Sequence, residues 1–177
     1  QCLVSKALPT HYGVVMPLGA KTKSHRPRSR KNLKKALVET LNVISKHKVK
    51  VKYILHDGEK SLAGNSLNLN ELTKEMKDEY DVILKALPKD VHCKNVENLI
   101  KQWKSKGRQT NFALPFMIPP SMLDHLAISA IVNYNMSPTS SNVNSVPPMA
   151  LMKGESIDYR KFCIASLGEV VYTNENN

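Results

Sequence analysis

The chain has 177 residues, of which 41% are hydrophobic and 23% charged, and its formal net charge is +11. This length and composition predict a globular protein with one domain and a core of its own. The longest nearly apolar run, LAISAIV at 126–132, is far shorter than the roughly 18 residues of a membrane-spanning helix, and no apolar leader opens the sequence. We therefore expect neither a membrane protein nor a secreted one, and because Gln1 is not a methionine we expect a piece of a longer polypeptide.

The first part of the sequence predicts two strands, a helix and a third strand. CLVSKAL (2–8) and HYGVVMPL (11–18) are short apolar runs that predict a hairpin or meander. Leucine and isoleucine recur at helical spacing over 33–47, which predicts an amphipathic helix. The run VKVKYIL (49–55) alternates and then becomes fully apolar, so we expect a strand that is half-buried at its start and buried at its end.

The middle of the sequence alternates between helix and strand patterns. Helical spacing over 68–79 is followed by DVILKAL (81–87), a strand candidate that Pro88 stops. A further helix is predicted from about residue 90 to 106, with an apolar face, a charged face and an end at Gly107.

The last part predicts a buried helix followed by irregular segments. After the loop LPFMIPP, Ser121 and Asp124 form a capping signature for a helix that continues to Tyr134. A polar loop follows, and the tail FCIASLGEVVYT (162–173) predicts one or two final strands. We assign residues 1–135 to the core and 136–177 to a polar linker and a carboxyl-terminal extension packed on that core.

The order of these elements favours an α/β fold. Two strands come first, and helices then alternate with the third and fourth strands. We expect the early strands to pair antiparallel and the later ones to join through helical crossovers.

The positive charge is concentrated in the first third of the sequence. Residues 1–60 hold 14 basic and 3 acidic side chains, whereas the net charge is +2 for 61–117 and −2 for 118–177. Two stretches, 21–35 and 46–52, contain 12 of the basic residues. Such a concentration indicates a polyanionic partner, because neutralising phosphates releases counterions. The alternative is a solubilising face or a nuclear-import signal.

Two acidic residues are candidate metal ligands. Asp57 follows the third predicted strand in YILHDGEK, at the kind of strand end where open α/β sheets place functional groups, although a plain turn is the alternative. Glu97 lies forty positions later on a predicted helix, followed by Lys101, Lys104 and Arg108. This spacing suits a carboxylate that holds a divalent cation and basic groups that track phosphates, or simply an i,i+4 ion pair between Glu97 and Lys101.

Several motifs, taken in order, resemble the integrase catalytic core of copia-type retrotransposon polyproteins. They are VKVKYILHDGEK, VHCKNVENLIKQWKSKGR, LPF, and the long segment from VNYNMSPTSS to LGEVVY. The resemblance spans about residues 1–173. It implies a ribonuclease-H-like mixed sheet flanked by helices, lacking its first strand, and membership of the DDE superfamily.

The same resemblance implies an activity and a set of site residues. The activity is 3′-end processing and strand transfer of DNA, with two Mg²⁺ or Mn²⁺ ions held by three carboxylates. Asp57 matches the second carboxylate and Glu97 the third, while Lys101, Lys104 and Arg108 match positions that contact DNA. The implied partners are retroelement ends and target DNA, a homo-oligomer is allowed, no membrane is involved, and the implied location is intracellular, in the nucleus or a cytoplasmic particle.

The sequence departs from the family pattern at several points. The first catalytic aspartate has no match, because Glu39, on a predicted helix, is the only acid ahead of Asp57. Asn98 stands where an arginine usually follows the glutamate, and Leu167 stands where the closing motif has phenylalanine. There is no zinc-binding amino-terminal domain. With two carboxylates we expect residues 1–177 to be catalytically inactive.

Two other interpretations stay open. One is a degenerate or domesticated nucleic-acid-binding module that kept the basic face without the chemistry. The other is an unrelated basic α/β protein, bound to RNA, in which Asp57 is only a turn residue.

Overall fold

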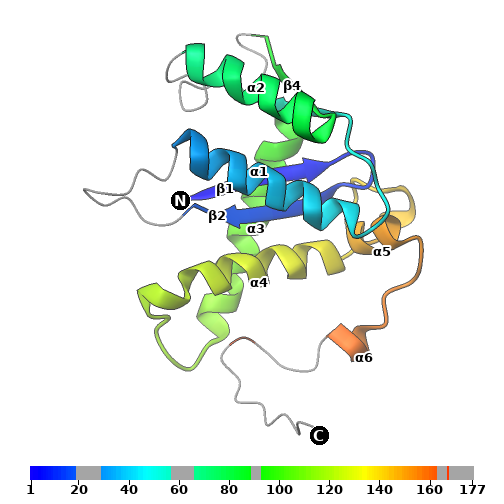
Figure 1. Ribbon diagram of the computed structural model, residues 1–177. Helices are drawn as coiled ribbons and strands as arrows, with labels where there is room; N and C mark the ends of the chain where they lie inside the picture. The colour runs from blue at the N-terminus through cyan, green and yellow to red at the C-terminus, as the bar shows by residue number, and fades with distance from the viewer. Residues whose placement is uncertain (19–28, 57–65, 89–92, 163–166, 168–177) are drawn as a thin grey trace, which may run out of the picture. The chain divides into compact units, whose positions relative to one another are not determined.

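The computed structural model describes residues 1–18, 29–56, 66–88, 93–162 and 167 (Figure 1). The chain forms two compact units: unit 1 comprises residues 1–6 and 13–100, and unit 2 comprises residues 7–12 and 101–177. Helices and strands are both present, so the expected mixed α/β class is confirmed. No helix in the described ranges is long and apolar enough to cross a membrane.

The predicted hairpin is confirmed. Strand β1 spans Cys2–Ala7 and β2 spans Tyr12–Pro17, and the two form one two-stranded sheet. The Leu18 N–H donates to the Gln1 carbonyl at 2.7 Å and closes the open end of the hairpin. The sequence of β2 has no charged side chain, and its first four residues are buried.

Helix α1 (Arg30–Ser45) joins the hairpin to the rest of unit 1. Its N-terminus is capped by Ser29, whose side chain accepts from the Asn32 N–H at 3.4 Å. Its apolar stripe has two contact regions. One packs with the hairpin and the other with the later elements of unit 1. The buried members of these two clusters are Leu18, Leu33, Ala36, Leu37, Leu72, Met76 and Leu84.

Strands β3 (Tyr53–His56) and β4 (Ile83–Ala86) pair in parallel, with Tyr53 opposite Ile83 and His56 opposite Ala86. Helix α2 (Ser66–Tyr80) connects them, as the predicted helical crossover requires. The expectation that β3 is buried at its end was wrong. Tyr53 and Leu55 are each 53% exposed, because only the alternate face of β3, through Ile54, packs on the α1–α2 core.

The predicted single mixed sheet is not formed by the described residues. They make two separate sheets of two strands, β1–β2 and β3–β4. Residues of both, Leu3 of β1 and Ile54 of β3, nevertheless pack against the same buried cluster. One core therefore serves two strand pairs within unit 1.

Helix α3 (Lys94–Ala113) is longer than its sequence pattern predicts. It does not end at Gly107 but continues for six more residues, and a Cβ placed on Gly107 would lie 3.7 Å from the Ala130 Cβ. The close approach of α3 and α4 (Leu123–Met136) accounts for a small residue at this point. The Trp103 indole N–H donates to the Ala127 carbonyl at 2.9 Å and fixes the same contact.

Four short elements of unit 2 flank α4 in the sequence. A 3-10 turn, η1 (Pro120–Met122), leads into α4, and no side chain caps the helix, so the predicted role of Ser121 as a cap was wrong. After α4 come η2 (Val143–Ser145), α5 (Pro148–Lys153) and α6 (Tyr159–Phe162). Apart from Phe162 and Leu167, the tail expected to form strands lies outside the described residues, and Phe162 belongs to a helix.

The polar segment between α4 and α5 is mostly exposed but is anchored by two buried side chains. Thr139 and Asn142 are buried, as is Asn135 near the end of α4. The Asn142 amide donates to the Val146 carbonyl at 2.8 Å and to the Thr10 carbonyl at 3.3 Å. These hydrogen bonds satisfy the Asn142 amide and explain how one polar side chain of this segment is buried.

Candidate nucleic-acid interface

The two predicted metal ligands are not both described. Asp57 lies outside the described residues, immediately after β3 ends at His56. Glu97 is exposed in the first turn of α3, and its N–H donates to the Cys93 carbonyl at 3.0 Å. The predicted meeting of Asp57 and Glu97 therefore stays a prediction.

A single carboxylate does not make a two-metal site. Mg²⁺ requires near-octahedral oxygen ligands, and Glu97 supplies at most two oxygens. Within the described ranges, no three His, Cys, Asp or Glu side chains gather as they would around a metal ion.

The three predicted DNA-binding residues lie on one side of α3. Lys101, Lys104 and Arg108 are separated by three and four residues, and all three are exposed. At 3.6 residues per turn, these spacings place them in one stripe along the helix axis. No ion pair within the described part of the chain involves any of them. Their charge is therefore available to a polyanion.

Two basic residues of α1, Arg30 and Lys34, are paired with acids of α2. Arg30 pairs with Glu71 and Glu75 of α2, and Lys34 pairs with Glu75 at 3.2 Å and with Glu79 at 2.8 Å. We call these five side chains the α1–α2 ion-pair ladder. Hydrogen bonding to Glu79 raises the pKa of Lys34, and hydrogen bonding to Lys34 lowers the pKa of Glu75. The ladder therefore neutralises charge that the sequence pattern assigned to a polyanion partner.

The second basic stretch is also partly neutralised. Lys50 pairs with Asp81 at 2.7 Å, and this contact lowers the pKa of the Asp81 carboxyl. Residues 19–28, which contain four of the basic side chains, lie outside the described part of the chain. Of the predicted concentrated basic face, Arg30, Lys34 and Lys50 are therefore paired with acids, whereas the exposed Lys31 of α1 has no ion pair among the described residues.

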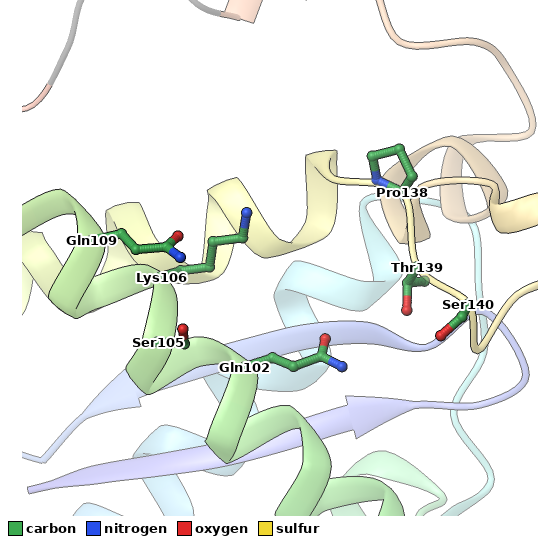
Figure 2. A pocket seen from close by; sticks show the side chains of 7 residues that line it. All are labelled: Gln102, Ser105, Lys106, Gln109, Pro138, Thr139 and Ser140. Atoms are coloured by element: carbon green, nitrogen blue, oxygen red, sulfur yellow. The ribbon is translucent and has the colours of Figure 1, made fainter.

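A shallow polar pocket lies on another side of α3, within unit 2 (Figure 2). It has a volume of about 270 Å³ and lies between the helix and the segment that follows α4. Its lining contains one ammonium group, amides and hydroxyls but no carboxylate: Gln102, Ser105, Lys106, Gln109, Pro138, Thr139 and Ser140. The pocket was not predicted from the sequence, although polar residues at 102, 105, 106 and 109 have the spacing of one helix face.

The comparisons with known proteins add no relative. No protein-family model matches the sequence, and a search of curated proteins finds no match.

Proposed function

We propose that the chain is a fragment of a retrotransposon integrase core that binds DNA through the exposed stripe of α3. The main support for this proposal is that Lys101, Lys104 and Arg108 share one face of a long helix. They form no ion pair within the described residues. Exposed cations at this spacing bind phosphates and release counterions. Glu97 lies one helical turn before the stripe, as the integrase resemblance requires.

The topology of unit 1 supports the proposed ribonuclease-H-like fold. Its two paired strands, a helix, and a parallel strand pair joined through α2 keep the order of elements expected from the sequence.

The proposed chemistry of the complete family is two-metal strand transfer. Mg²⁺ or Mn²⁺ ions, when bound, would activate an attacking hydroxyl and stabilise the leaving oxygen. Asp57 and Glu97 would supply two of the three carboxylates. Residues 1–177 have no counterpart of the first aspartate, so we propose that they bind DNA without transferring strands.

The alternative is a degenerate or domesticated nucleic-acid-binding module. The observation that favours it is the same missing acid: Glu39, the only acid ahead of Asp57, lies on α1 and pairs with Lys35 at 3.8 Å. This alternative shares the DNA-binding surface and omits the chemistry.

The salt dependence of DNA affinity tests the proposed surface. We expect the affinity for duplex DNA to fall steeply with salt, and replacing Lys101, Lys104 and Arg108 by alanine should make the slope of log K against log salt shallower by about 2 to 3. Fluorescence anisotropy of a labelled duplex over a salt series measures this slope.

A second triple variant controls for net charge. Lys74, Lys77 and Arg160 are also exposed, and they lie on α2 and α6. Their replacement by alanine removes the same charge and should leave most of the slope intact. Equal losses in the two triple variants would show that α3 is not the DNA-binding surface.

A further inference from the structure

We propose that Phe112 stacks on an unpaired nucleobase at the end of the basic stripe of α3. The stripe and Phe112 would together bind a DNA strand end or a single-stranded segment, with phosphates on the cations and a base on the ring. This inference rests on the proposed DNA-binding function and adds the class of DNA that α3 prefers.

Phe112 continues the stripe along the helix. It follows Arg108 by four residues and Lys101 by eleven, and α3 is continuous to Ala113. At 100° per residue, the four side chains lie within a sector of roughly 80°. With a rise of about 1.5 Å per residue the stripe is about 16 Å long, which is close to the length of five nucleotides of one strand.

The aromatic ring is not part of the protein core. Phe112 is 84% exposed, whereas Leu99 is 1% exposed. Trp103, which donates its N–H to α4, precedes Phe112 by nine residues, or two and a half turns, so the two rings lie on opposite sides of the helix. The ring is therefore free of α4, and its place at the end of a cationic stripe is what points to a ligand with flat bases and phosphates.

The charge of the stripe decides which partner fits. A lipid surface or an apolar protein groove would require apolar residues along the same face, but the preceding positions on this face are lysine, lysine and arginine. Single-stranded nucleic acid offers phosphates and flat bases together, and aromatic rings next to cationic side chains bind it by stacking. Paired bases in a duplex are already stacked, so the ring selects an unpaired base.

The loop after α3 also exposes apolar side chains. Phe116 and Met117 are exposed, with 94% exposure for Met117, and they lie beyond the helix end. Met117 provides a matched control, because it is apolar and exposed near Phe112 in the sequence but has no ring.

Binding to two DNA probes tests the stacking. One probe is a blunt duplex, and the other is the same duplex with a single-stranded overhang of about five thymines. We expect Phe112→Ala to weaken binding of the overhang probe by about 5- to 150-fold and to change blunt-duplex binding by less than about twofold. Phe112→Trp should retain binding, and Phe112→Leu should lose as much as alanine.

Other outcomes would overturn the inference. Equal effects of Phe112→Ala on both probes, full binding by Phe112→Leu, or an equal loss in Met117→Ala would show that no base stacks on this ring. Loss of a dimer in Phe112→Ala by sedimentation, with DNA binding unchanged, would assign the face to a second copy of the chain. A wild-type affinity that does not depend on salt would instead overturn the phosphate stripe, so the two failures are distinguishable.

Discussion

Glu75 has a central place in the charge distribution of unit 1. Its carboxylate accepts hydrogen bonds from Arg30 and Lys34, which come from the part of the sequence with the highest positive charge. Glu75 lies 45 residues after Arg30, and Glu79 lies 45 residues after Lys34. The sequence showed the excess of lysine and arginine in residues 21–35 but not the partners, because helix packing decides which charges meet.

We expect Glu75→Gln to raise the affinity of the protein for duplex DNA. The substitution removes one negative charge, and Arg30 and Lys34 no longer share a carboxylate. Both side chains of α1 can then contact phosphates. Anisotropy at low salt measures the gain, and Glu79→Gln, which releases Lys34 alone, should give a smaller one.

The same variant has a defined pH dependence. The folded-state pKa of Glu75 is lowered, so its contribution to stability is present above the unfolded value of about 4.5 and is lost as pH falls through the folded value. The wild-type advantage in thermal midpoint over Glu75→Gln should therefore be constant near neutral pH and shrink below about pH 4.5. An advantage that grew on acidification would exclude the ladder as its source.

Helix ends were the least predictable feature of the elements. Gly107 looked like a stop signal, since glycine costs up to about 1 kcal/mol in a helix interior. Contacts of α3 with α4, including the Trp103 hydrogen bond, offset this cost in the structure. Hydrophobic spacing predicted that the helices exist, and packing between them set where they end.

Two glycine substitutions should have opposite effects on stability. Gly107→Ala should stabilise the protein by about 0.5 to 1 kcal/mol, because the new Cβ makes an ordinary contact with Ala130 at 3.7 Å. Gly154→Ala should destabilise it by about 1 kcal/mol, because Gly154 ends α5 with φ of +72°. Denaturant unfolding of both variants measures the signs, and two changes of the same sign would contradict this account of the backbone.

For the whole molecule, the sequence predicted the order of the elements but not the division of the strands. Alternation in a strand indicates which residues share a face, and it does not determine which strands pair. The hairpin, the crossover through α2 and the stripe on α3 were therefore predictable. The separation into two sheets was not, and Phe112 was missed because the helix was predicted to end before it.

The proposed strand-transfer chemistry can be tested by comparing residues 1–177 with a longer protein. We expect residues 1–177 to give no strand-transfer product with Mg²⁺ or Mn²⁺, and we expect activity when a strand carrying the missing aspartate is joined ahead of Gln1. In that longer protein, Asp57→Asn and Glu97→Gln should abolish transfer and change DNA affinity by less than about twofold. Asp78→Asn, an exposed acid on α2, is the matched control, and transfer that survives Asp57→Asn would remove Asp57 from the mechanism.

The two strand pairs of unit 1 also affect how the protein behaves at high concentration. The outer edges of β1 and β3 are paired with no other described strand, and β3 carries the exposed Tyr53 and Leu55 beside its edge. Such edges template addition of strands from other molecules, and mutual repulsion between chains of charge +11 opposes that addition. Because salt screens this repulsion, ionic strength acts on self-association and on DNA affinity in opposite directions: the dilute buffers that strengthen DNA binding also keep the protein dispersed.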